Sequence, residues 1–257
     1  MENTLYYGDN LDILQRYITD EAIDLVYLDP PFKSGQNYNI LFKEKNGSQA
    51  ASQIRAFEDT WTWSQEDEAI FADLVTKGGK VSDCLQAFRT FLGPCDMLAY
   101  LVMMAPRLVE LRRVMKPTAS IYLHCDPTAS HYLKLLLDAV FRAQYFRNEI
   151  IWHYRRWTAP SRKFQCLHDV ILFYTKGNAY TFNQLLTPYT KGSVERKEQG
   201  VLHRFKRGEE PVLVSDGEVQ AEGVPENDVW HIPFVAPSCG CSNDLRTFAE
   251  RAPRHWR

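Results

Sequence analysis

The chain has 257 residues, of which 45% are hydrophobic and 24% are charged, and its formal net charge is −2. This length fits one large domain or one domain with a sizeable insertion, and the apolar content excludes wholesale disorder. A net charge near zero does not decide for or against nucleic acid, because binding depends on local patches. With no signal pattern and no run of about 18 apolar residues, the sequence predicts a cytoplasmic protein without membrane association.

The first expected element is a helix that opens at Asp9 and Asn10, both good N-capping residues. A short β-rich apolar run follows at Leu25–Leu28. Its continuous hydrophobicity is typical of a strand buried on both faces of a parallel sheet. The run stops abruptly at Asp29-Pro30-Pro31-Phe32.

Asp29 therefore follows the carboxyl end of a strand, where open α/β sheets bind their ligands. Pro30 and Pro31 hold the backbone extended and supply carbonyl acceptors without N–H donors, while Phe32 adds a flat ring. This combination suits a planar ring with an exocyclic amino group. The carboxylate and carbonyl oxygens would accept hydrogen bonds from its two N–H groups, and the ring would stack on Phe32. A plain strand-terminating turn is the alternative.

Strands and helices alternate further along the chain. Residues 33–95 are polar and read as an insertion after the first strand. A helical pattern then runs from Leu101 to Met115, where Pro106 predicts a kink or a new helix start. The remaining expected elements are a strand at Ala119–His124, a helix at His131–Phe141, and strands at Asn148–Tyr154 and Val170–Tyr174. The runs Ala119–His124 and Val170–Tyr174 are continuously apolar like Leu25–Leu28, so they too are expected as strands of a parallel sheet. This alternation predicts an α/β fold.

Asp126 follows the strand at Ala119–His124 and is expected at the same edge as Asp29, whereas His124 reads as a buried, hydrogen-bonded histidine.

Between Arg142 and Lys176, basic and aromatic residues alternate, which suits a polyanion with stackable bases or an ordinary solvated loop. Cys239 and Cys241 with His231 lack the spacing of a zinc site, so no metal is expected.

The strand that ends in Asp-Pro-Pro-Phe resembles motif IV of the DNA amino-methyltransferases, which methylate adenine N6 or cytosine N4. Further segments are similar to the same family in its β-class order, as in type III modification subunits. They are LYYGDNLDIL at 5–14, FEDTWTW at 57–63, SIYLHCDPTASHYLKLLLDAVF at 120–141, FRNEIIWHYRRW at 146–157, HDVILFYTKG at 168–177 and DVWHIPF at 228–234.

The resemblance implies a Rossmann-like methyltransferase fold, a mostly parallel sheet with helices on both faces. It also implies methyl transfer from S-adenosylmethionine to a base flipped out of double-stranded DNA, with adenine N6 favoured over cytosine N4 by the aspartate of motif IV. A second copy or a restriction subunit is a further possible partner. The implied catalytic residues are Asp29, Pro30, Pro31 and Phe32. The implied cofactor-binding residues are Asp9, Asn10, Asp29 and Asp126, and the implied DNA-binding residues are Arg155, Arg156, Arg162 and Lys163.

The sequence departs from the family near its end, where neither an F-x-G-x-G-like element nor a T-Q-K-P-like segment occurs. We therefore expect a chain incomplete at its C-terminus, either a methyltransferase or a catalytically weak or inactive DNA-binding remnant of one. The expected organisation is a catalytic domain at 1–177 that includes the insertion, a loop-rich target-recognition region at 178–234 and a divergent tail at 235–257.

Overall fold

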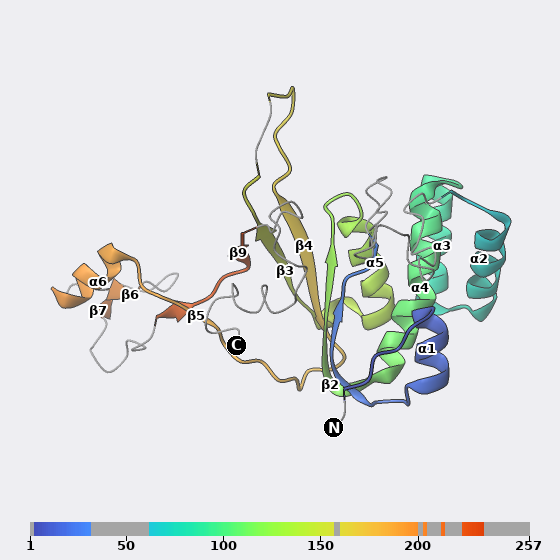
Figure 1. The fold of residues 1–257 in the computed structure, drawn as a ribbon, viewed down its shortest axis with the longest axis horizontal. Helices are drawn as coiled ribbons and strands as arrows, with labels where there is room; N and C mark the ends of the chain where they lie inside the picture. Colours follow the sequence, from blue (N-terminus) through green and yellow to red (C-terminus); the bar gives the residue numbers. More distant parts are fainter. Residues whose placement is uncertain are drawn as a thin grey trace, which may run out of the picture. The chain divides into compact units, whose positions relative to one another are not determined.

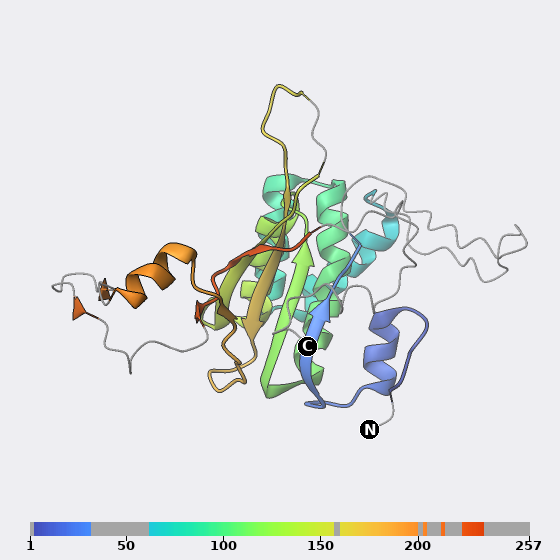
Figure 2. The ribbon, with the colours of Figure 1, turned by 60° about the vertical axis from the view of Figure 1, so that its left-hand side comes forward.

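The computed structural model describes residues 3–31, 62–156, 160–199, 203–204, 212–213 and 223–233. The chain divides into two units, one made of Met1–Thr181 and Val229–Pro233 and the other of Phe182–Asp228 and Phe234–Arg257. Among its described residues, the first unit holds a five-stranded sheet and five α-helices, whose arrangement Figures 1 and 2 show. None of the helices that the structure describes is long and apolar enough to cross a membrane.

The sheet has the strand order β1-β2-β4-β3-β9. Its strands are β1 (Ile23–Leu28), β2 (Met115–Cys125), β3 (Phe146–His153), β4 (His168–Thr175) and β9 (Val229–His231). β1 is parallel to β2 and β3 is parallel to β9, but β4 pairs antiparallel with both β2 and β3. The sheet is therefore mostly parallel, as expected, with β4 reversed. The expectation that the run Val170–Tyr174 forms a parallel strand is wrong.

The helices of the first unit are α1 (Asn10–Tyr17), α2 (Gln65–Lys77), α3 (Gly79–Leu92), α4 (Asp96–Val114) and α5 (Ser130–Phe141), and a 3-10 turn, η1, covers Ala143–Tyr145. α2 begins with a capping box between Ser64 and Asp67, which satisfies the first backbone donors of the helix. Pro106 lies inside α4, so no new helix starts there. α2 and α3 fall in the range expected as an insertion, yet their residues Leu74 and Leu85 are buried in the core.

The core lies between the sheet and the helices, which Figure 1 shows on one side of the sheet. Alternate side chains of the strands, such as Ile121, Leu123 and Leu172, pack there against α2 to α5 with no exposed surface. On the opposite face Leu25 and Tyr27 are each 59% exposed, so β1 is not buried on both sides. Within the described residues the helices of this unit thus cover one face of the sheet, not the two that were expected.

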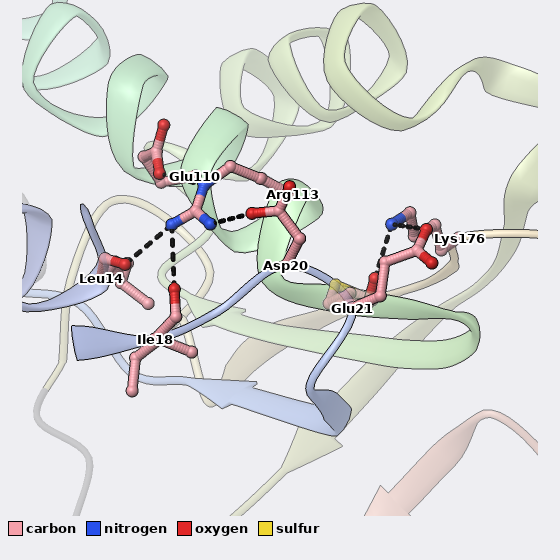
Figure 3. A network of polar contacts seen from close by, with 8 residues as sticks. Leu14, Ile18, Asp20, Glu21, Glu110, Arg113 and Lys176 are labelled. Carbon is pink, nitrogen blue, oxygen red and sulfur yellow. Dashed lines mark hydrogen bonds and ion pairs between the residues drawn. The ribbon is translucent and has the colours of Figure 1, made fainter. Parts of the chain in front are cut away.

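A network around Arg113 anchors the chain where it enters β1 (Figure 3). The guanidinium donates 2.8 and 3.2 Å hydrogen bonds to the carbonyls of Leu14 and Ile18 and pairs with Asp20 and Glu110. These contacts join the α1–β1 connection to the last turn of α4. The network thereby fixes the start of β1, the strand that Asp29 follows.

The second unit has short elements in its described part. They are β5 (Leu186–Thr187), α6 (Lys191–Glu198), β6 (His203–Arg204), β7 (Val212–Leu213) and β8 (Val224–Pro225). β5 pairs with β8 and β6 pairs with β7, each antiparallel. Each of these paired strands is two residues long.

Candidate active site at the carboxyl edge of the sheet

Asp29 directly follows β1, and the pairing of β1 with β2 brings it beside His124. Leu28 is opposite Leu123, so the next residue on each strand shares the following register position. The Asp29 side chain is 60% exposed, whereas that of His124 is 8% exposed. The sequence therefore places an accessible carboxylate and a buried imidazole together at the carboxyl edge.

His124 contacts two carboxylates, one through each ring nitrogen. Its Nδ1 lies 3.0 Å from Oδ1 of Asp29, and its Nε2 lies 3.5 Å from Oδ2 of Asp169. Burial by itself lowers the pKa of His124, but the contacts with Asp169 and Asp29 outweigh it and raise the pKa to about 9. The ring is therefore an imidazolium near neutral pH, and the expectation of a buried, hydrogen-bonded histidine is confirmed.

Asp169 reaches this edge because β4 runs antiparallel to its neighbours, so the start of β4 lies beside the end of β2. The residue is directly opposite Trp152 of β3, and its Oδ1 accepts a 3.2 Å hydrogen bond from the Tyr154 hydroxyl. The Trp152 ring lies 5.2 Å from the His124 ring, between centroids. Trp152 and Tyr154, together called the aromatic wall, thus contact the imidazole of His124 and the carboxylate of Asp169.

Tyr27 lies two residues before Asp29 and shares its side of the strand. Burial, followed by the negative charges of Asp29 and Asp169, raises the pKa of Tyr27 to about 12. The phenol is therefore protonated over the physiological range. Its half-exposed ring extends the open, aromatic side of the sheet next to the carboxylates.

The residues after Asp29 are only partly described. Pro30 is buried and Pro31 is half-buried, whereas Phe32 lies outside the described residues. The predicted stacking of a base on Phe32 therefore stays a prediction. Of the predicted catalytic segment, the structure describes the carboxylate and both prolines.

The other predicted cofactor residues already have contacts within the fold. Asp9 caps α1 by accepting a 2.7 Å bond from the amide of Leu11, and both of its carboxylate oxygens lie within 3.0 Å of Nη2 of Arg107. Asn10 accepts a 2.8 Å bond from Nε of Arg107. Asp126 accepts a 2.9 Å bond from the amide of Ala129 at the start of α5.

These contacts bear on whether the described residues fit S-adenosylmethionine. The side chains of Asp9, Asn10 and Asp126 serve local capping and a tie to α4. The Asp29 carboxylate is 60% exposed and is held by His124 through Oδ1. The described residues therefore form the side of a site that would hold an amino group, and they do not by themselves form a cradle for the cofactor.

The predicted DNA-binding residues lie together on the connection between β3 and β4. This connection extends from the carboxyl edge of the sheet (Figures 1 and 2). Its four predicted cations are all exposed: Arg155, Arg156, Arg162 and Lys163. The guanidinium of Arg156 lies 5.3 Å from the ring centroid of Tyr154, so one cation of the connection packs on the aromatic wall of the site.

A histidine pair lies at the same edge, where Nδ1 of His153 is 3.1 Å from Nδ1 of His231. Cys239 and Cys241, which were weighed with His231, lie outside the described residues. In the ranges that the structure describes, no group of three His, Cys, Asp or Glu residues is placed to hold a metal ion.

A cavity of about 490 Å³ lies elsewhere, between the helices. It is lined by residues such as Glu110 and Arg112 near the end of α4 and Lys176, which directly follows β4. These ends lie at the amino edge of β1 and β2. The cavity is therefore separate from Asp29.

Sequence reasoning missed Asp169 as a site residue. The signal that could have found it is an acid directly before the apolar run Val170–Tyr174. That acid lies at the carboxyl edge of β2 only because β4 is antiparallel, and the sequence does not show this direction. Tyr27 was missed because alternation within an apolar run does not show which face of the strand remains open.

Comparison with known proteins gives consistent results. A family model described as DNA methylase matches residues 23–255. The chain is 24% identical over 221 residues to the "Type III restriction-modification enzyme StyLTI Mod subunit" of Salmonella typhimurium, covering 84% of this chain and 30% of that protein. It is 25% identical over 189 residues to the "Type II methyltransferase M.EcaI" of Enterobacter cloacae, covering 72% and 32%.

The chain thus spans about a third of the length of these two relatives. Among solved structures, it is similar to TTHA0409 of Thermus thermophilus complexed with S-adenosyl-L-methionine, at 13% identity and a TM-score of 0.38. That likeness covers 90% of this chain and 67% of the other.

Proposed function

The chain belongs to the DNA methylase family of amino-methyltransferases, and from this premise we propose that it methylates the exocyclic amino group of a base in DNA, with adenine N6 as the target. The observation that carries the proposal is the Asp29 carboxylate, which is 60% exposed at the carboxyl edge of the sheet and held there through its Oδ1. The choice of adenine rests on the aspartate at the first position of the Asp-Pro-Pro-Phe motif.

Asp29 suits this reaction because an amino nitrogen on an aromatic ring is a poor nucleophile, its lone pair being delocalised. A carboxylate that accepts one of its hydrogens, and the Pro30 carbonyl that accepts the other, draw the nitrogen toward tetrahedral geometry. Positive charge develops on the nitrogen as the methyl group arrives, and the fixed carboxylate stabilises it. Once the base is held in line, positioning accounts for much of the rate.

We propose S-adenosylmethionine as the methyl donor, because methylases of this family need an activated methyl group, which the bound cofactor supplies. Asp9, Asn10 and Asp126 stay proposed cofactor contacts. We propose no step through the cofactor, because their side chains have partners within the fold.

Double-stranded DNA is the proposed substrate, and the cations Arg155, Arg156, Arg162 and Lys163 are its proposed phosphate contacts. Their position beside the carboxyl edge would bring the backbone of the DNA close to Asp29. A base could then leave the duplex and stack on Phe32. We place this activity in the cytoplasm, where the proposed substrate lies.

A restriction subunit or a second copy of the chain is a proposed partner. The relative from Salmonella typhimurium is a subunit of a restriction-modification enzyme, which supports the first of these. Target recognition is proposed for residues 178–234.

The test is transfer of labelled methyl from S-adenosylmethionine to mixed-sequence duplex DNA by the unchanged chain, the Asp29→Asn variant and an Asp73→Asn control. Asp73 is also 60% exposed, but it lies on α2 and pairs with Lys77. We expect Asp29→Asn to lose at least about 100-fold in rate and the control to keep its rate. Full activity of Asp29→Asn would overturn the role of this carboxylate, and DNA binding without any transfer would favour the DNA-binding remnant.

A further inference from the structure

We propose that His124 is a positioning residue of the methylation site: by bridging Asp29 and Asp169, it fixes the Asp29 carboxylate and leaves one oxygen of it for the substrate amino group. This inference rests on the proposed function. The inference adds to the proposed site a residue that acts through Asp29 and does not itself touch the base.

The contacts of the ring leave it little freedom. Nδ1 lies 3.0 Å from Oδ1 of Asp29, and Nε2 lies 3.5 Å from Oδ2 of Asp169. Trp152 flanks the ring at 5.2 Å between centroids, and the imidazole is 8% exposed. A rotation that kept one of these contacts would break the other, so an exposed carboxylate is held by a buried and oriented partner.

The Asp29 carboxylate keeps one oxygen available. Within the part of the chain that the structure describes, His124 is the residue that contacts this carboxylate, and it does so through Oδ1. Oδ2 remains for a ligand at the open edge. Fixing one oxygen fixes the direction of the other, which pre-organises the acceptor before the base arrives.

Charge explains why a histidine suits this position. A neutral imidazole has one N–H donor and one lone pair, so it would face one of the two carboxylates with its lone pair. The imidazolium carries an N–H on each ring nitrogen, so it presents positive charge to both carboxylates and leaves the group of three with a net charge of −1. That remaining negative charge matches the positive charge that develops on the substrate nitrogen.

Other titratable groups lie on the same strand as the ring and on the strands around it. Asp29 and Tyr27 come from the β1 side, Tyr122 from β2, Asp169 from β4 and Tyr154 from the end of β3. Burial is the largest cause that raises the pKa of each phenol, to about 12 for Tyr27 and Tyr154. The phenols therefore stay protonated over the range in which the imidazole changes charge.

The first experiment tests the contacts of His124 with Asp29 and Asp169 by a measurement that does not depend on methyl transfer. The imidazole nitrogens of His124 are followed by NMR across a pH series in the full chain and in its Asp29→Asn and Asp169→Asn variants. We expect the imidazolium of the unchanged chain to persist above pH 8, and each substitution to shift its titration to lower pH. A ring that loses its proton below pH 6.5, or that titrates alike in all three proteins, would overturn the bridge.

The second experiment measures methyl transfer by His124→Ala and His124→Asn, with His131→Ala as control because His131 is exposed on α5. A misplaced acceptor lowers kcat by about 100-fold while the KM for DNA stays nearly constant. The Asn side chain keeps a donor near the position of Nδ1, so it restores part of the lost kcat. Equal losses in both variants, or a change confined to KM, would contradict a positioning role.

The two experiments separate the inference from the proposed function. If the unchanged chain transfers no methyl group but the imidazole titrates as expected, the proposed function fails and the bridge stands. If transfer occurs and His124→Ala keeps its kcat, the methylation site is supported and the positioning role of His124 is wrong.

Discussion

Nδ1 of His124 lies 3.0 Å from Oδ1 of Asp29, although 95 residues separate the two along the chain. The parallel register of β1 and β2 makes this contact possible, because it places the two residues side by side at the carboxyl edge. The contact joins the exposed carboxylate of the proposed chemistry to a buried cation. It also gives the protein a measurable dependence on pH.

Stability should fall as the pH rises from about 6.5 to about 9. His124 has a raised pKa in the folded chain, so its contribution is complete below the pKa of the unfolded state and is lost as pH passes the folded value. The shift corresponds to about 3 kcal/mol at most. Urea unfolding at a series of pH values should show this decline, and His124→Gln should remove most of it. An unchanged decline in that variant would assign the effect to other groups. The pKa of the Cys84 thiol, raised by burial to about 11, affects stability only at higher pH, above about 9.

Leu108→Ala should lower the free energy of unfolding by about 3 kcal/mol, because the side chain is fully buried on α4 and its loss leaves a cavity. The neighbouring Val109 is 40% exposed, so Val109→Ala should change stability by less than about 1 kcal/mol. Denaturant unfolding of both variants measures the difference. Equal effects would mean that α4 does not pack its Leu108 side into the core.

Arg107→Ala should loosen α1. The Arg107 side chain is 12% exposed and holds both Asp9 and Asn10, so its loss removes one of the ties between α1 and α4. Amide exchange in α1 should become faster, with a cost of about 1–3 kcal/mol. Arg16→Ala is the matched control on the same helix, because the Arg16 side chain is 68% exposed and its pair with Asp12 contributes little. Unchanged exchange in Arg107→Ala would show that other contacts hold α1 in place.

Arg155→Gln and Arg156→Gln should each weaken binding to duplex DNA about equally for all sequences. Each lost phosphate contact should lower the slope of log affinity against log salt by about 0.9. Fluorescence anisotropy over a series of salt concentrations measures the slope, with Arg16→Gln as an exposed cation on another element. A salt slope that is the same in all four proteins would place the DNA elsewhere.

Much of the sheet could be predicted from the sequence, because its strands are compact apolar runs. The runs at Leu25–Leu28, Ala119–His124 and Val170–Tyr174 all lie within strands, and the helix at His131–Phe141 is confirmed. α2 and α3 were missed because few of their side chains are buried. Phe71 and Leu74 are the buried residues of α2, which is too narrow a stripe to stand out in a polar segment.

Half of the site could not be predicted, because the direction of a strand in a sheet cannot be read from the sequence of that strand alone. Asp29 was placed correctly at the carboxyl edge by the motif that follows its strand. Asp169 lies at the start of its strand, and in a parallel strand it would lie at the opposite edge. The antiparallel pairing of β4 reverses that position, and this pairing depends on contacts between segments far apart in the sequence.

The most direct test of the proposed function is nucleoside analysis of duplex DNA incubated with the full chain and methyl-labelled S-adenosylmethionine. The account predicts label in N6-methyladenine, from the unchanged chain and not from Asp29→Asn. Label confined to N4-methylcytosine would contradict the adenine assignment. DNA without label would contradict methyl transfer by this chain.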